Sequence, residues 1–429
     1  MSRRLIALLI VTISILAACG RANATHPAAG GYLLFLEGGF SNNAETVQVL
    51  DTGTGSVLRE MQIGTPACDW SRHYIVTQLT GGAQLKAIDP ASGRTLAQTA
   101  VPAGYQLPNI AFQGPSAGIS PNGQWLTLTS QSHSSGGAIT TNFLVGSSSL
   151  NDSFKTIHVS GDFLFDALSN DGNSLYLVQK MLEPNHYRVR LYDVAAGYFD
   201  PQPIADKREP NEPMNGIRGD SATDPTGNHV YTVYIRNAGP FIHALPLGQP
   251  FAWCVDLPPS THANDIDMQF HWALAVSHDG LYLYAANAAL RTVAVMTSGD
   301  APTVVRTRTV ALNLPVPPTG EGPGGGLVAD AEAKGPSIGG AALSGDSRTL
   351  FTFGETGVLA IDTATLKVRA RYLDPWRPDT MRMSSDGKWL YVAESSENKL
   401  WQINPVTGSV SELRAATNPW ALLWAQPKG

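Results

Sequence analysis

The sequence has few charges and few cysteines. Only 15% of its 429 residues are charged, and the formal net charge is −6. No basic stripe is present to neutralise phosphates, so a nucleic-acid partner is not expected. The Cys-x-x-Cys pair, the His-Glu-x-x-His zinc motif and the Gly-x-x-x-x-Gly-Lys phosphate loop are also absent. The sequence therefore does not indicate a dithiol oxidoreductase, a zincin or a P-loop enzyme.

Long hydrophobic runs are absent except near the N-terminus. There Arg3 and Arg4 precede an uncharged apolar run over residues 5–18, which Cys19 follows. This run is too short to span a bilayer, but it fits the apolar region of a secretion signal behind a basic start. The sequence therefore predicts a signal peptide at 1–18, a polar tether at 19–30 and a single domain at 31–429.

The end of that run, Leu16-Ala17-Ala18-Cys19, resembles the lipobox of bacterial lipoproteins. The resemblance implies a lipid on Cys19 and a protein anchored to a bacterial membrane outside the cytoplasm, periplasmic or at the outer surface. An ordinary cleaved signal without an anchor is the alternative. Without residues 1–18 the chain has 27 basic and 35 acidic residues, so its field is mildly acidic.

Glycine and proline, in contrast, are abundant, with 42 and 29 residues, which favours short strands joined by turns. Residues 383–391 read Met-Ser-Ser-Asp-Gly-Lys-Trp-Leu-Tyr, in which an Asp-Gly turn leads into a strand with an aromatic residue. Asp-Gly and Asn-Gly supply the positive φ angles that a tight hairpin needs. This stretch therefore predicts a β-hairpin.

The hairpin signature occurs six times, at intervals of 49, 55, 53, 67 and 40 residues. A strand-filled period of this length indicates propeller blades. A second signature, an acidic or amide residue followed by a Thr-Gly-like turn, closes third strands at 51–53, 89–93, 362–365 and 404–408. The aromatics expected to pack between blades are Trp125, Tyr176, Tyr231, Tyr284, Phe351 and Tyr391.

These repeated turns resemble YVTN-type and quinoprotein-amine-dehydrogenase-like propellers over nearly all of residues 31–425, and WD-repeat proteins more loosely. The resemblance implies a fold. The Gly-His and Trp-Asp dipeptides of true WD repeats do not recur in phase.

The two ends of the chain are expected to close the ring. The chain opens with three predicted strands, at 32–37, 46–51 and 57–62, and ends with a spare strand at 420–425. A ring leaves no sheet edge unpaired at its seam if the last strand completes the first blade. With a degenerate blade at 66–102 and six signature-bearing blades, this predicts an all-β, eight-bladed propeller, with seven blades as the alternative.

On this blade assignment, Cys68 lies on an inner strand and Cys254 on an outer strand three blades away. That separation is too large for a disulfide, so both are expected to be buried thiols.

Charged residues on predicted inner strands would line the central channel, where they could bind a small polar ligand or pair with one another. These residues are Asp69, Arg72, Asp166, Arg218, Asp220, Asp265, Asp267, His271, Asp379 and Arg382.

Four metal-competent residues, His262, Asp265, Asp267 and His271, lie within ten residues of one another. Alternation along a strand would place the last three on one side. Their spacing matches no defined ligand pattern, so neither a metal nor another cofactor is expected.

Long polar connections are predicted between second and third strands and between successive blades. Both kinds emerge on one face of a propeller, which is therefore expected to carry the variable loops. The Gly-rich connection at 313–335 is either a lid or a tolerated insertion.

The sequence favours a monomeric, membrane-anchored propeller that serves as a non-catalytic binding or scaffold module for a protein or glycan partner of the cell envelope. The alternative is an enzyme resembling propeller lactonases, lyases or quinoprotein dehydrogenases, with its site at the central channel. No catalytic residue of those families can be placed on this sequence.

The lipid anchor is testable by labelling cells with an alkyne fatty acid. Wild-type protein is expected to take up the label and to fractionate with membranes, because the thiol of Cys19 accepts the lipid. A Cys19→Ala variant is expected to lose both properties. A variant that stays labelled and membrane-bound would contradict the lipoprotein assignment.

Overall fold

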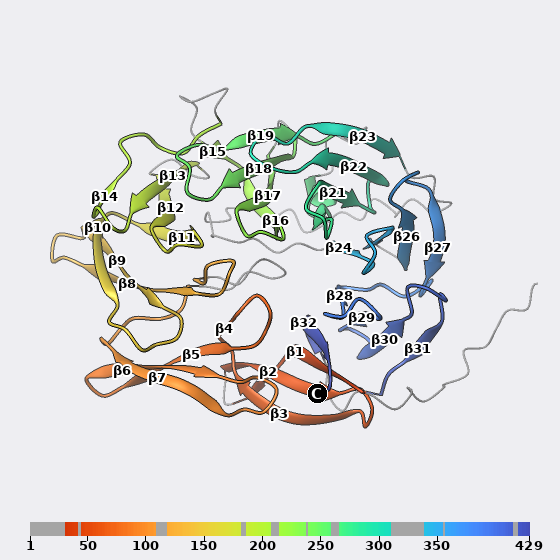
Figure 1. The fold of residues 1–429 in the computed structure, drawn as a ribbon, viewed down its shortest axis with the longest axis horizontal. Coiled ribbons are helices and arrows are strands. Elements are labelled where there is room, and N and C mark those ends of the chain that lie inside the picture. Colours follow the sequence, from red (N-terminus) through yellow and green to blue (C-terminus); the bar gives the residue numbers. More distant parts are fainter. Residues whose placement is uncertain are drawn as a thin grey trace, which may run out of the picture.

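A computed structural model describes residues 31–41, 44–108, 118–181, 186–206, 214–236, 239–258, 266–309, 339–354, 357–414 and 419–429. Their strands form eight antiparallel sheets in a ring about a central axis, which is an eight-bladed β-propeller (Figure 1). The predicted fold class is confirmed, with eight blades and not seven. Within these ranges no helix is long and apolar enough to cross a membrane. Cys19 and the predicted signal and tether, up to residue 30, lie outside them.

Blades 1 to 4 contain the N-terminal half of the chain. In blade 3 three strands form the sheet, and on the inner side of its first strand the described residues make two isolated bridges, Ile119 with Leu126 and Gln106 with Thr129. The strands, from the axis outward, are β32 (Pro419–Pro427), β1 (Tyr32–Ser41), β2 (Ala44–Asp51) and β3 (Ser56–Gln62) in blade 1; β4 (Thr65–Pro66), β5 (His73–Leu79), β6 (Gly82–Ile88) and β7 (Thr95–Val101) in blade 2; β8 (Trp125–His133), β9 (Ile139–Ser147) and β10 (Lys155–Ser160) in blade 3; and β11 (Phe163–Leu168), β12 (Ser174–Lys180), β13 (His186–Asp193), β14 (Tyr198–Phe199) and the short β15 (Met214–Asn215), which also pairs with β13, in blade 4.

Blades 5 to 8 are four-stranded, and a one-turn helix, α1 (Ile266–Gln269), precedes blade 6. The strands, from the axis outward, are β16 (Ile217–Thr223), β17 (His229–Ile235), β18 (Phe241–Pro246) and β19 (Trp253–Asp256) in blade 5; β20 (Ala273–Val276), β21 (Tyr282–Asn287), β22 (Thr292–Thr297) and β23 (Val304–Thr309) in blade 6; β24 (Gly340–Leu343), β25 (Thr349–Phe353), β26 (Val358–Asp362) and β27 (Val368–Tyr372) in blade 7; and β28 (Thr380–Met383), β29 (Leu390–Glu394), β30 (Lys399–Ile403) and β31 (Val410–Glu412) in blade 8.

The ring closes as the sequence predicted. The C-terminal strand β32 pairs antiparallel with β1, with Leu34 opposite Ala425 and Leu36 opposite Leu422. On the other side of β1 lies β2, so β32 is the innermost strand of blade 1 (Figure 1). An ion pair of 2.6 Å between Lys428 Nζ and Asp51 Oδ2 holds the end of the chain to the end of β2.

Apolar side chains fill the space between neighbouring blades. Eight hydrophobic clusters among the described residues are each shared by two adjacent blades, which accounts for every junction of the ring. The repeated aromatics Tyr176, Tyr231, Phe351 and Tyr391 are fully buried in them, as expected. Trp125 does not occupy the same repeat position as the other aromatics. It follows the serine of its turn by five residues, whereas Tyr391 follows the serine of its turn by seven.

The Ser-x-Asp-Gly turn is a self-contained hydrogen-bond unit. In blade 8, Ser384 Oγ donates to Asp386 Oδ1 (2.8 Å) and accepts from the Trp389 N–H (3.0 Å). Gly387 donates its N–H to Ser384 O (2.8 Å) at φ 68°, a left-handed conformation that costs glycine little. The side-chain bonds recur at Ser120, Ser169, Ser277 and Ser344.

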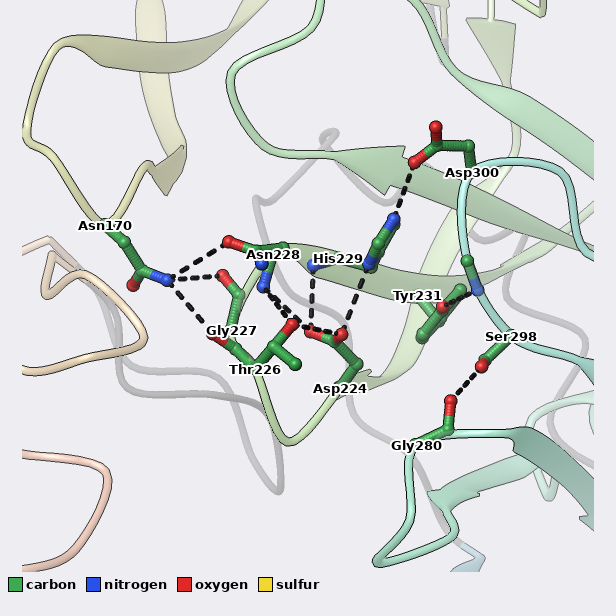
Figure 2. Close-up of polar contacts among 11 residues, drawn as sticks. Asn170, Asp224, Thr226, Gly227, Asn228, His229, Tyr231, Gly280, Ser298 and Asp300 are labelled. Carbon is green, nitrogen blue, oxygen red and sulfur yellow. Dashed lines mark hydrogen bonds and ion pairs between the residues drawn. The ribbon is translucent and has the colours of Figure 1, made fainter.

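These turns also bond to one another around the ring. Asn170, in the turn of blade 4, donates its Nδ2 to the carbonyl oxygens of Thr226 and Gly227 in blade 5, at 3.2 Å each (Figure 2). On its other side, Asn170 Oδ1 accepts the N–H of Asn122 in blade 3 (2.9 Å). One amide side chain therefore joins three successive blades.

His229 makes a similar link between blades 5 and 6. Its Nδ1 lies 3.2 Å from Asp224 Oδ2 and its Nε2 lies 2.7 Å from Asp300 Oδ1, so the ring sits between two carboxylates (Figure 2). The hydrogen bond with Asp224 outweighs burial and raises the pKa of His229. Burial opposes ionisation of Asp224, but hydrogen bonds from His229 and Thr226 outweigh it and lower the pKa of Asp224 to about 2.

The two cysteines differ from expectation. Cys68 is exposed in the turn after β4, because that inner strand is only two residues long and ends at Pro66. Cys254 does lie on the outermost strand of blade 5, but it is partly exposed and not buried. No disulfide joins them.

The closure is testable at Leu422, whose side chain is fully buried at the junction of blades 8 and 1. Leu422→Ala is expected to lower the free energy of unfolding by about 2–5 kcal/mol, because it leaves a cavity in that junction. Chemical denaturation measures the change. Val406→Ala is the matched control, since Val406 is 91% exposed and is expected to have no effect. Equal midpoints for Leu422→Ala and wild type would contradict the closure.

The link at His229 predicts a pH-dependent stability. Because the folded state raises the pKa of His229, its contribution is complete below the pKa of the unfolded chain and is lost as the pH rises through the folded pKa. His229→Gln should therefore lower stability by up to about 1 kcal/mol near pH 5.5 and by less at pH 8.5. Thermal unfolding at both pH values measures this, with the exposed His133→Gln as control. A loss of stability of equal size at pH 5.5 and pH 8.5 would contradict the electrostatic role of His229.

Candidate functional site

Four of the predicted channel residues lie on the innermost strands of blades 4, 5 and 8. They are Asp166 on β11, Arg218 and Asp220 on β16, and Arg382 on β28. The pairing of β11 with β12 skips Asp166, and that of β16 with β17 shifts by one residue across Gly219 and Asp220. Such bulges re-aim side chains and are common beside functional sites.

Asp166 and Arg218 form a buried ion pair between blades 4 and 5. Arg218 Nη1 donates to Asp166 Oδ1, and the two side chains are only 5% and 4% exposed. Burial opposes the charge on Arg218, but Asp166 outweighs it and raises the pKa of Arg218. The two charges neutralise each other, so this buried pair links blades 4 and 5.

Asp220 joins blade 5 to blade 6. Its Oδ2 accepts the N–H of Leu274 on β20 (2.7 Å), and the residue is 6% exposed. Burial raises the pKa of Asp220 to about 7, while the Leu274 N–H and the charge of Arg382 oppose that rise. At neutral pH this carboxyl group therefore populates both protonation states, as a general acid or base needs.

Arg382 lies on the innermost strand of blade 8 and is partly exposed. Its Nη1 donates to the carbonyl oxygen of Met381 (3.2 Å). Burial lowers the pKa of Arg382, and the charge of Asp220 raises it, so the two groups act on each other without a direct ion pair. The strands between them, β20 and β24, have the sequences ALAV and GAAL. The innermost strands of blades 5 to 8, which are β16, β20, β24 and β28, therefore carry three charged residues: Arg218, which is paired with Asp166, and Asp220 and Arg382.

Three further candidates lie apart from this pair. Asp379 precedes β28, and its Oδ2 accepts the N–H of Ser395 (2.7 Å). Burial raises the pKa of Asp379. Asp69 and Arg72 were predicted on an inner strand, but they lie in the turn between β4 and β5 and line a pocket of about 650 Å³ between blades 2 and 3. The reason is the short β4, which ends before them.

The predicted strand with metal-competent residues is wrong. Residues Ile266–Gln269 form α1, and His271 lies in the turn that follows, so alternation along a strand does not apply to Asp267 and His271. His262 and Asp265 lie outside the described residues. Among the described residues no group of three or more His, Cys, Asp or Glu side chains could hold a metal ion.

The pocket opens on the face that carries the turns between first and second strands and between third and fourth strands, here called the turn face. The sequence predicted the long, variable connections on the opposite face. The Gly-rich connection at 313–335 lies outside the described residues. The blade that departs from the common turn is the degenerate blade at 66–102, which lacks the hairpin signature in the sequence.

One short motif went unrecognised in the sequence. Residues 114–118 read Gly-Pro-Ser-Ala-Gly, the Gly-x-Ser-x-Gly pattern of serine hydrolases. That pattern works on a strand-to-helix turn above a largely parallel sheet, and eight antiparallel sheets do not provide this context. Ser116 lies outside the described residues.

Solved structures with a similar fold include the periplasmic gluconolactonase PpgL of Pseudomonas aeruginosa, at 17% identity over 81% of this chain and 96% of that one, with a TM-score of 0.40. AztD of Citrobacter koseri is 11% identical over 94% of this chain and 99% of that one, with a TM-score of 0.47. The dihydro-heme d1 dehydrogenase NirN in complex with DHE is 13% identical over 95% of this chain and 77% of that one, with a TM-score of 0.50. At these identities the likeness shows the fold alone. No protein-family model and no curated protein matches the chain, so the YVTN resemblance stays a prediction.

Proposed function

We propose that this chain is an extracytoplasmic propeller enzyme whose site lies on the inner ring at Asp220 and Arg382. The feature that supports this most directly is the placement of Asp220 and Arg382 on innermost strands, with Asp220 at a bulge of β16 and its pKa raised by burial to about 7. A buried carboxyl group with a raised pKa and a guanidinium that acts on it, both on innermost strands, are the kind of arrangement expected of an acid–base site.

The chemistry that suits this pair is hydrolysis of an ester or lactone. Asp220, as the base, takes a proton from water while the water oxygen bonds to the carbonyl carbon. Arg382 donates hydrogen bonds to the oxyanion that develops there. The bond between that carbon and the leaving oxygen then breaks, and Asp220 returns the proton to the leaving oxygen.

Small hydroxylated lactones are the first substrates to assay. The partly exposed Arg382 suits a carbonyl or carboxylate oxygen, and the flanking strands β20 and β24 carry small or aliphatic side chains. The gluconolactonase among the similarly folded proteins supplies a practical choice of compounds. The lipid anchor at Cys19 would hold the enzyme outside the cytoplasm, where such compounds diffuse freely.

The proposal is tested by measuring proton release from a panel of aldonolactones between pH 6 and 8. Wild type is expected to hydrolyse at least one, with an inflection in rate near pH 7. Asp220→Asn should lower kcat by about 100-fold or more, because the general base is lost. Asp279→Asn is the matched control, since Asn122 takes the same turn position in blade 3, and it should keep full activity.

A folding check accompanies this test. Between pH 3.8 and about 7 Asp220 keeps a proton in the folded protein that it loses in the unfolded chain, so its own contribution to stability falls as the pH rises through that window. Asp220→Asn should remove this decline while the protein stays folded. Full activity in Asp220→Asn would overturn the role of Asp220. No turnover by wild type across the panel, with a protein or glycan captured by the tethered chain, would instead support the non-catalytic scaffold.

A further inference from the structure

The turn of blade 7 keeps the common hydrogen bonds but differs at one residue. In the other five blades with the turn signature, the fourth turn residue is a glycine with φ between 68° and 75°: Gly123, Gly172, Gly227, Gly280 and Gly387. In blade 7 it is Ser347, at φ 55°, a left-handed conformation that is unfavourable for a residue with a Cβ. Its backbone N–H bonds to Ser344 O (2.8 Å), as the glycines do in their own turns. The turn itself therefore does not require a hydroxyl group at this position.

The hydroxyl group of Ser347 contacts a histidine in the turn of blade 6. His278 Nδ1 lies 2.7 Å from Ser347 Oγ, and the backbone N–H of His278 donates to the same oxygen (3.0 Å). Because Oγ accepts that N–H, its own hydrogen is left for Nδ1, which assigns Nδ1 as the acceptor and the ring hydrogen to Nε2. Ser347 and His278 therefore lie as a nucleophile and its base do, at hydrogen-bond distance.

A link between neighbouring turns does not by itself require this pair. In blade 8 the residue at the position of His278 is Ser385, which reaches blade 1 through its backbone N–H (2.8 Å to Ala425 O). In blade 4 the amide of Asn170 makes the link. Blades 6 and 7 instead pair an imidazole with a serine in a strained conformation, and backbone strain that persists in a folded protein gathers at sites of chemistry.

The groups around the pair suit attack on an ester. Ser347 is partly exposed and His278 is exposed, so a substrate reaches the hydroxyl group from solvent. The guanidinium of Arg348, the next residue, is 82% exposed, and its Nε lies 3.9 Å from Asp346 Oδ2. Arg348 therefore stays available to the oxyanion of a bound ester. Within the described residues no carboxylate bonds to His278 Nε2 as in a catalytic triad, so slow acylation is expected.

We propose that Ser347 is a nucleophile that His278 activates, and that it takes an acyl group from esters that reach the turn face. Its Oγ bonds to the carbonyl carbon while its proton moves to His278 Nδ1. The bond from that carbon to the leaving oxygen then breaks, and Nδ1 gives the proton to the leaving oxygen. Water releases the acyl group when Nδ1 takes the water proton and returns it to Oγ. The site does not depend on the hydrolysis proposed for Asp220.

The mature chain is incubated with a biotinylated fluorophosphonate, which phosphonylates an activated serine as fluoride leaves, and peptide mass spectrometry locates the label. Wild type is expected to be labelled at Ser347, faster at pH 8 than at pH 5, because a protonated imidazole cannot take the proton. Cleavage of p-nitrophenyl acetate should show a burst and then slow turnover. His278→Asn, which places the residue of blade 4 in this turn, should slow labelling and burst by about 100-fold or more.

Ser347→Gly separates chemistry from folding, because glycine restores the common turn. This variant should lose the label and the burst, yet unfold at an equal or higher denaturant concentration than wild type. Ser385→Ala is the matched control, since Ser385 is exposed in the turn of blade 8 and bonds through its backbone. It should be labelled as wild type is, and so should Asp220→Asn. An unlabelled wild type, a label only at another serine, or equal labelling rates in His278→Asn and wild type would each overturn the proposal.

Discussion

The pairing of β32 with β1 is the contact on which the rest of the ring depends. Blades touch only their neighbours, through apolar clusters, so the last junction can form only if the two ends of the chain meet in one sheet. Three strands from one end and one from the other also remove the unpaired edge that a simple repeat would leave at the seam. Fully buried Leu422 and Leu36 face each other at this seam, with an ion pair from Lys428 to Asp51 beyond them.

Within that closed ring the repeat works on two levels. Tyr176, Tyr231 and their equivalents fill the space between blades. The hydroxyl groups of Tyr176 and Tyr231 also accept the N–H of a glycine in a turn of the next blade, Gly248 (2.7 Å) and Gly299 (2.6 Å) respectively. On the turn face, polar links such as Asn170 and His229 join successive hairpin turns. The apolar contacts supply most of the stability, because they remove large surfaces from water. The polar links fix how each turn meets the next.

The regular features of this fold could be predicted from the sequence because they repeat. The Asp-Gly turns, the closing strand and the number of blades each rest on signals that recur in phase or follow from closure. Residues between signatures were harder to place. Asp267 and His271 were predicted on a strand, but Asp267 lies in the one-turn helix α1 and His271 in the turn after it. A single helical turn is too short to give a periodic pattern in the sequence. Cys68, Asp69 and Arg72 were predicted on an inner strand, but β4 is only two residues long and ends before them. The residues after Pro66 give no signal in the sequence that the strand ends there.

The candidate sites lie where the repeat is broken, and this explains why the sequence located them poorly. Asp166 and Asp220 stand at bulges, which depend on how two strands align in three dimensions. The pocket between blades 2 and 3 lies beside a turn of blade 2 that lacks the common serine turn and contains Trp70 at positive φ. A repeat that satisfies its own hydrogen bonds leaves nothing for a ligand to bind. In a ring of similar blades, the departures from the common turn and the common register are therefore the positions at which chemistry or binding can arise. Here they fall on the turn of blade 2 and on the inner strands of blades 4 and 5.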